Sequence, residues 1–287
     1  MPSSRRPRAA RSRSSFRHWR TALVVCAFVA AAAVGVGVAV QLPSAGAGTR
    51  VTDGFVAQPP PPTQAPSTPS VSPPPSVTPS SPAAPVLTLS GPGPAKGRGS
   101  FAYDERSSGV LGRAGTLRRY RVAVENGSGE EVRDFGDAVQ RALAGPGSWV
   151  DGGKLRLQRV GPHDRYDFTI YLATRDTAGR LCGAGGIDIR VGGVPYTSCR
   201  VPGKVVINLA RWRTSAPHLV AAGMPLDDYR LYVVNHEVGH QLGHRHEGCP
   251  GAGRPAPVMQ QQTLFLKGCR PNPWPYVGGK RYTGPAL

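Results

Sequence analysis

Apolar residues recur at helical spacing in two stretches of the chain after residue 130. The first stretch predicts a helix over Val132–Ala144, with four apolar positions on one face: Val132, Phe135, Val139 and Leu143. The second predicts a helix that ends near Gly243, with a similar stripe: Leu231, Val234, Val238 and Leu242. Both helices are expected to pack one face on a core.

Other apolar runs have the composition of strands. They are Leu117–Val124, Leu155–Val160, Asp167–Thr174 and a buried strand over Lys204–Trp212. With the helices, this order predicts an α+β fold: a twisted mixed sheet with two main helices. The segment Gly186–Arg200, just before the last strand, is the expected exposed edge. The chain after Gly243 is rich in Pro and Gly, and we expect it to be irregular.

The N-terminal segment predicts export. Residues 1–20 carry seven Arg and no acidic residue, and residues 21–40 are uncharged and apolar. That run is long enough to cross a bilayer as a signal anchor, with the basic flank inside. The small residues Ala45-Gly46-Ala47-Gly48 favour instead a cleaved signal peptide. The protein is therefore expected either on the cell membrane, with its C-terminal domain outside, or secreted.

Residues 41–96 form a linker dominated by Pro, Ser and Thr, a composition that favours extended chain and cannot bury a core. The domain is expected over residues 97–287. The formal net charge is +18, of which the seven N-terminal Arg supply much. The rest is spread along the domain and predicts a solvated basic face. No nucleic-acid-binding module is recognised, so we expect no nucleic-acid partner.

The stretch His236-Glu237-Val238-Gly239-His240 combines metal ligands with a base. His236 and His240 lie one helical turn apart on one face, where two neutral imidazoles can bind one Zn²⁺. Glu237 lies about 100° further round the helix, beside the ion and not on it. It is suited to act as a general base on water activated by the metal.

His244 and His246 compete for the place of third ligand. On a continuous helix His244 would lie about 12 Å along the axis from His236, too far to share an ion. The helix must therefore stop, and Gly243 can take the left-handed conformation that ends it. We predict His246 as the third ligand, and His244 as a solvated or supporting residue.

Five cysteines are present. Cys26 lies in the apolar segment, and the other four lie in the exported domain, where an even number suggests disulfides. Of the three possible pairings, nearest neighbours give Cys182–Cys199 and Cys249–Cys269. Cys249 could instead offer a thiolate to the zinc, although three His already leave the open position that a catalytic site needs.

The full motif, H-E-x-x-H-x-x-G-x-x-H over residues 236–246, resembles that of the metzincin clan of zinc peptidases. The sequence from Tyr229 to Tyr276 most resembles a family of secreted actinobacterial proteins that carry this motif. The resemblance implies a metzincin-like domain whose Met-turn, Pro257-Val258-Met259-Gln260, lies under the zinc. It also implies that an extended substrate pairs with an edge strand above the zinc, for which Gly186–Arg200 is the candidate. The sequence departs from some metzincins at Gln261, where those enzymes have Tyr. Glu247 is expected to be a turn residue or to form a local salt bridge.

These features predict an extracytoplasmic zinc metalloendopeptidase that takes a peptide or protein substrate. Zinc would polarise the scissile carbonyl, and Glu237 would transfer a proton from the attacking water to the leaving amine. Two other functions stay open: a zinc-bearing binding or adhesion module without turnover, and a hydrolase of peptidoglycan amide bonds. An intact Glu237 favours an enzyme over a binding module.

Overall fold

The computed structural model of the protein describes residues 84–287. The basic segment, the apolar segment and most of the Pro-rich linker lie outside the described residues. The apolar segment is the predicted membrane anchor, which therefore also lies outside them. Within residues 84–287, no helix has the length and apolar character needed to cross a membrane.

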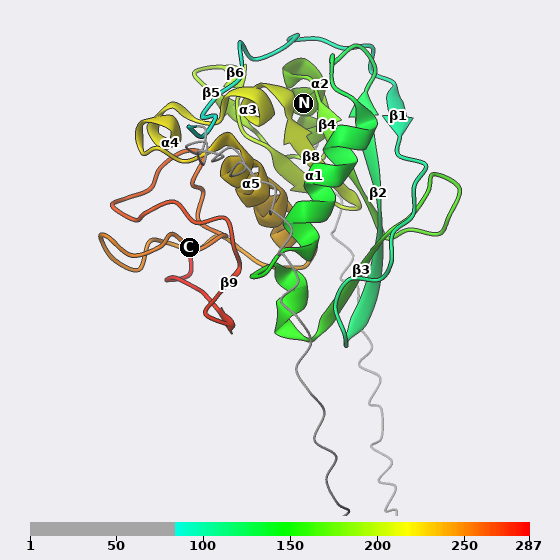
Figure 1. The fold of residues 1–287 in the computed structure, drawn as a ribbon. Coiled ribbons are helices and arrows are strands. Elements are labelled where there is room, and N and C mark those ends of the chain that lie inside the picture. The colour runs from blue at the N-terminus through cyan, green and yellow to red at the C-terminus, as the bar shows by residue number, and fades with distance from the viewer. Residues whose placement is uncertain (1–83) are drawn as a thin grey trace, which may run out of the picture. The chain divides into compact units, whose positions relative to one another are not determined.

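A mixed sheet forms the centre of the fold (Figure 1), with strands in the order β1-β2-β4-β8-β7. Strands β2, β4 and β8 run parallel, while β1 pairs antiparallel with β2 and β7 antiparallel with β8. Strand β3 runs parallel to β2 and shares an edge of it with β1. The bounds are β1 Phe101–Tyr103, β2 Thr116–Glu125, β3 Leu155–Arg159, β4 Phe168–Ala173, β7 Cys199–Val201 and β8 Lys204–Asn208.

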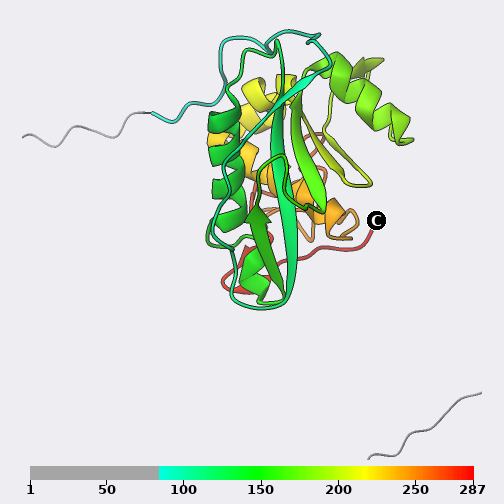
Figure 2. The same ribbon diagram turned by 90° about the vertical axis from the view of Figure 1, so that its right-hand side faces the viewer.

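Helices cover both faces of this sheet (Figure 2). Helices α1 (Val132–Ala144) and α5 (Leu226–Gln241) pack together on one face, over the larger core. Helix α2 (Arg175–Ala184) covers the other face over a smaller core with Val206 and Val201. Shorter elements complete the fold: the 3₁₀ helix Trp149–Gly152, α3 Leu209–Thr214, α4 Pro217–Ala221, and the hairpins β5–β6 (Arg190–Val191, Val194–Pro195) and β9–β10 (Tyr276–Val277, Lys280–Arg281).

The predicted α+β class with a mixed sheet is confirmed, and helix α1 has the predicted bounds. The strand predicted over Lys204–Trp212 is wrong in its second half. It ends at Asn208, whose side chain accepts a hydrogen bond from the Ala210 backbone N–H at 3.0 Å and so caps α3. Helix α2 was not predicted, because Gly179 and Gly183 interrupt its apolar pattern.

The domain begins earlier than the predicted boundary at residue 97. The Leu89 N–H donates to the Arg213 carbonyl, and the Leu226 N–H at the start of α5 donates to the Val86 carbonyl, both at 2.8 Å. Leu89 also packs against the larger core. The last part of the predicted linker is therefore part of the domain.

The chain after α5 is irregular, as predicted, and buried amide side chains hold it in place. Gln262 donates to the Pro257 and Asn272 carbonyls, and Asn272 donates to the Ala256 carbonyl. Tyr232 of α5 also bonds this region: its hydroxyl donates to the Gln260 carbonyl and accepts from the Gln262 N–H. The segment is thus fixed to the helix without regular secondary structure.

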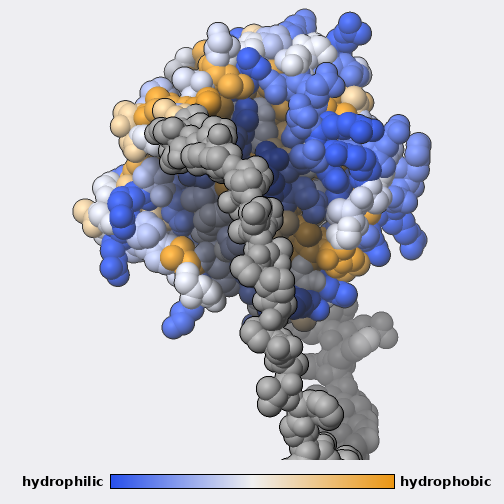
Figure 3. Space-filling model, viewed as in Figure 1, coloured by the Kyte–Doolittle hydropathy of each residue, from blue (hydrophilic) through white to orange (hydrophobic). Residues whose placement is uncertain are grey.

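The surface in Figure 3 is hydrophilic mainly on the side of β1 and β2, and hydrophobic residues appear as separate patches. Strand β2 contributes to this hydrophilic side through the exposed Arg118 and Arg119. This distribution agrees with the solvated basic face expected from the sequence.

Two disulfides have the pairing expected from nearest neighbours, Cys182–Cys199 and Cys249–Cys269. The first joins α2 to β7 at the edge of the sheet. The second closes the irregular segment behind α5. Each spans a short loop, of 17 and 20 residues respectively.

Opening either disulfide is expected to destabilise the protein by about 3 kcal/mol, because each closes a loop in the unfolded chain. The test is denaturant unfolding of Cys182→Ser/Cys199→Ser and of Cys249→Ser/Cys269→Ser, with peptide mapping of the non-reduced wild type. Crossed pairs or free thiols at these four positions in exported protein would refute the assignment.

Candidate metal centre

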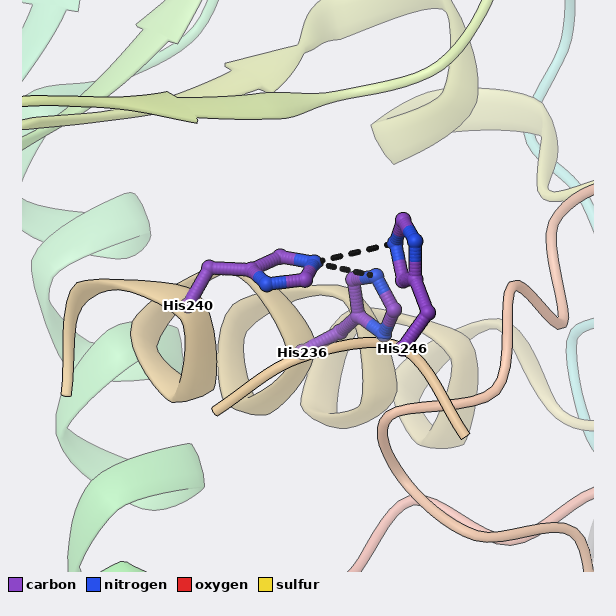
Figure 4. A group of neighbouring side chains, drawn as sticks. All are labelled: His236, His240 and His246. Atoms are coloured by element: carbon purple, nitrogen blue, oxygen red, sulfur yellow. Dashed lines mark hydrogen bonds between the residues drawn. The ribbon is translucent and has the colours of Figure 1, made fainter. Parts of the chain in front are cut away.

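Three imidazole rings converge at the C-terminal half of α5 (Figure 4). His236 and His240 project from α5, and His246 returns from the segment that follows it. The Nε2 of His240 lies 3.2 Å from that of His236 and 3.1 Å from that of His246. The three ligand atoms all lie within 4.8 Å of one another, close enough to hold one metal ion.

The hydrogen bonds of two rings fix which nitrogens face inward. His236 Nδ1 lies 2.8 Å from the Val258 carbonyl, and His240 Nδ1 lies 2.8 Å from the His244 carbonyl. A carbonyl only accepts, so each Nδ1 carries the proton and each Nε2 presents a lone pair. Lone pairs about 3 Å apart repel one another, and a cation between them removes the repulsion.

The spacing of these nitrogens suits zinc. At Zn–N bonds of about 2.0–2.1 Å, tetrahedral geometry separates two ligand nitrogens by about 3.3–3.4 Å. The Nε2 separations of 3.1 and 3.2 Å are close to that value. The residues that would hold the ion are therefore His236, His240 and His246.

Burial keeps these rings neutral at physiological pH. Burial and the neighbouring His240 together lower the pKa of His236 to about 3. The pKa values of His240 and His246 are also lowered, in both cases mainly by burial. A neutral imidazole is the form that binds a metal, so little free energy is needed to deprotonate the ligands.

Gly243 makes the return of the chain possible. Its φ is +97°, in the left-handed region that a side chain disfavours, and its N–H donates to the His240 carbonyl at 3.1 Å. The ring of His244 is directed elsewhere and stacks on Trp149 with centroids 4.3 Å apart. His244 thus contributes its backbone carbonyl, which orients His240, and His246 joins the cluster, as the sequence predicted.

Glu237 lies in the same cleft as the three His and is 5% exposed. Burial raises the pKa of this carboxyl to about 8. A carboxyl with this pKa is mostly protonated at pH 7, and a cation held by the three His would favour the ionised form, which is the form that a general base needs.

Met259 packs underneath α5 and is fully buried. A Cβ added to Gly239 would meet the Met259 sulfur and, at 2.7 Å, the Trp149 ring. The glycine in the middle of this helix is therefore required by close packing, because any side chain there would displace the residues beneath the metal centre. Local sequence patterns did not identify Trp149 as the residue that packs beneath Gly239.

The other predicted positions near the centre also have clear partners. Glu247 forms a salt bridge that is not local: its carboxylate lies 2.8 Å from a nitrogen of Arg281, which is 34 residues away in sequence. Cys249 is bonded to Cys269 and is not available as a thiolate ligand. Gln261 lines the cleft.

The cleft has a volume of about 590 Å³. Residues from three parts of the chain line it beside the motif: the segment Ile187–Ile189, the edge strand β7, and the segment after Met259. The sequence did not identify Tyr232 or Thr263 as part of this cleft, and it included Arg200 only as the last residue of the predicted edge Gly186–Arg200. Tyr232 and Thr263 lie near the motif or the Met-turn, but only the fold brings Arg200 there.

Gly239→Ala is expected to lower the free energy of unfolding. Ala gains about 1 kcal/mol in helix propensity, but overpacking costs about 1–3 kcal/mol. Gly183 in α2 is the matched control, because nothing lies within 4 Å of a Cβ added there. Gly183→Ala is expected to stabilise the protein in the same denaturant titration. Equal stabilisation by both changes would contradict the packing argument.

The full chain is expected to bind one zinc ion. His246→Ala should lose the ion, because two imidazoles remain. His244→Ala should retain it, because the alanine keeps the carbonyl that bonds His240. Metal analysis of the two purified variants tests this. Zinc lost from His244→Ala and kept by His246→Ala would overturn the ligand assignment.

Comparison with protein families identifies residues 88–277 as a match to the family described as "Protein of unknown function (DUF3152)". In the comparisons with curated proteins and with solved structures, no protein matches. The family match begins close to the first packed residues of the domain and includes the whole metal centre and both disulfides. The chain belongs to the DUF3152 family.

Proposed function

We propose that the protein is a zinc metallopeptidase that hydrolyses peptide bonds outside the cytoplasm. The observation that carries the proposal is the placement of a buried carboxylate, Glu237, in the same cleft as three convergent imidazoles. Three neutral ligands leave a tetrahedral metal with one open position, as in catalytic zinc sites. A structural zinc site has that position filled by a fourth protein ligand.

The chemistry divides between the metal and Glu237. When bound, zinc supplies Lewis-acid polarisation of the scissile carbonyl and makes a coordinated water more acidic. Glu237 takes a proton from the water as the water oxygen attacks the carbonyl carbon. It then delivers that proton to the amine nitrogen as the C–N bond breaks. The carboxylate ends in its starting form, ready for another cycle.

Strand β7 is suited to align an extended substrate beside the metal. It is the last strand of the sheet and flanks the cleft. A two-residue turn joins Val201 to Lys204, and in such a hairpin these two residues hydrogen-bond to each other through their backbones. Bonded and non-bonded pairs alternate along an antiparallel ladder, so the next pair, Arg200 and Val205, has no mutual backbone hydrogen bonds. The backbone N–H and C=O of Arg200 therefore face the free edge, where a substrate strand could pair with them.

The edge strand is much shorter than the edge predicted over Gly186–Arg200. Most of that segment is not part of the sheet: Arg190–Val191 pairs with Val194–Pro195 in a separate hairpin. Ile189 is buried, at 4% exposure. The edge that flanks the metal centre is Cys199–Val201, at the end of the predicted range.

The proposal places the protein near the metzincin peptidases. Three features support this: the motif on α5, the return of the chain after Gly243, and Met259 beneath the ligands. Two disulfides agree with an oxidising compartment, and hence with a membrane-anchored or secreted protein. Gln261 lines the cleft at the position where some metzincins have Tyr, so the protein departs from those enzymes there.

Two alternatives predict different results in the same assay. A binding or adhesion module would bind zinc and ligand without turnover. A peptidoglycan hydrolase would cleave amide bonds of isolated cell wall and leave linear peptides of the common amino acids intact. The assay therefore presents the zinc-loaded full chain with peptide libraries and with isolated cell wall.

Glu237→Gln is the test of the mechanism. Gln preserves the shape of the side chain but cannot take the proton, and loss of a general base typically costs about 10²–10⁴-fold in rate. The variant should keep zinc, fold and substrate affinity and lose nearly all hydrolysis. Cleavage at the wild-type rate by Glu237→Gln would show that the mechanism is wrong. Absence of zinc-dependent cleavage by the wild type would favour the binding module.

A further inference from the structure

The cleft contains a cation whose role the proposed mechanism leaves open. Arg200 is the middle residue of β7, is half-buried, and lines the cleft. Its cross-strand partner Val205 belongs to the core beneath α5, so the Arg200 side chain points to the same face as α5. Arg200 lines the same cleft as His236 and His240, and it contacts Gln241, the residue that follows His240.

One hydrogen bond holds the guanidinium in place. Its Nε donates to the Gln241 side-chain oxygen at the end of α5, at 2.9 Å. Within residues 84–287, no hydrogen bond or ion pair engages the two terminal nitrogens, and no carboxylate lies within 4.0 Å of the side chain. An arginine fixed through Nε presents these nitrogens as a planar fork, which matches the two oxygens of a carboxylate.

The acidic groups of the cleft do not neutralise this charge. Asp188 on the cleft wall is already paired with Arg190, at 2.9 Å. Glu237 is buried at the metal centre. Arg245 adds a further positive charge on the lining. A peptide entering the cleft therefore meets an unpaired positive charge at Arg200, beside the strand with which its backbone would pair.

We propose that Arg200 determines specificity by binding a carboxylate of the substrate next to the scissile bond. The proposal rests on the proposed peptidase function and names the substrate class: peptides with an acidic group on the His240 side of the metal. That group is either an acidic side chain or a C-terminal carboxylate, since both offer the two oxygens that the fork fits. Arg200 binds substrate and leaves the proton transfers to Glu237.

The test compares matched peptides that differ only in this charge. One pair carries Glu or Gln at each position around the cleaved bond in turn. A second pair ends in a free carboxylate or an amide and so separates the two sources of the group. The zinc-loaded full chain should prefer the acidic member by about tenfold or more in kcat/KM, the usual effect of one hydrogen-bonded charge pair.

Three variants give the comparison its control. Arg200→Gln should lose the preference, and Arg200→Glu should reverse it in favour of Lys over Glu at the same position. Arg119→Gln is the matched control, because that arginine is exposed on β2 and does not line the cleft. It should keep the wild-type preference. Zinc content and thermal unfolding confirm that each variant is folded and loaded.

A binding measurement separates this proposal from the peptidase function. The same peptides, carrying a fluorophore, are titrated into zinc-loaded Glu237→Gln protein with and without Arg200→Gln. Preference for the acidic peptide that depends on Arg200 supports the proposal, even if the wild type cleaves nothing and the peptidase function fails. Cleavage without acidic preference, or preference that survives Arg200→Gln, overturns the proposal and leaves the peptidase function standing. Neither cleavage nor preferential binding overturns both.

Discussion

One helix can supply two imidazoles to a metal ion but not three, and the candidate metal centre is built around this limit. A third ligand on the same face of α5 would lie too far along the axis, at about 1.5 Å per residue. The chain therefore has to leave the helix and return, which Gly243 allows with its φ of +97°. The return brings His246 to the cluster and places the His244 carbonyl against His240. The left-handed turn thus supplies both the last ligand and the support for an earlier one.

The irregular C-terminal segment supports the metal ligands, which explains why it is held firmly although it lacks regular structure. The Val258 carbonyl orients His236, and Met259 fills the space beneath Gly239. Small shifts of this segment would move a ligand ring, because packed interiors transmit displacement. Hydrogen bonds from Tyr232 to Gln260 and Gln262, together with the Cys249–Cys269 disulfide, restrain it. The geometry of the metal centre therefore depends on contacts between α5 and the irregular segment that follows it.

Local sequence patterns were sufficient wherever the determining contacts are local. The periodicity of residues 132–144 predicted α1, and the motif spacing predicted which three imidazoles converge. Predictions were wrong or missing where a capping side chain ends an apolar run or where contacts distant in sequence decide. An apolar run continued past Asn208, but that side chain caps a new helix. Helix α2 lacks a clear apolar stripe and is positioned by the sheet and a disulfide. Trp149 and Arg200 reach the centre only because α5 packs against the segment after α1 and beneath the edge of the sheet.

The place of Arg200 shows how the sheet can couple alignment to recognition. Along a strand, the backbone groups of one residue point sideways while its side chain points to a face of the sheet. At Arg200 the sideways direction is the free edge, and the face is that of α5 and the metal ligands. A substrate strand that paired with the Arg200 backbone would thus bring its neighbouring side chains within reach of the guanidinium. Arg200 would then both pair with the substrate backbone and bind a substrate carboxylate. A peptide shifted along the edge would lose both interactions together.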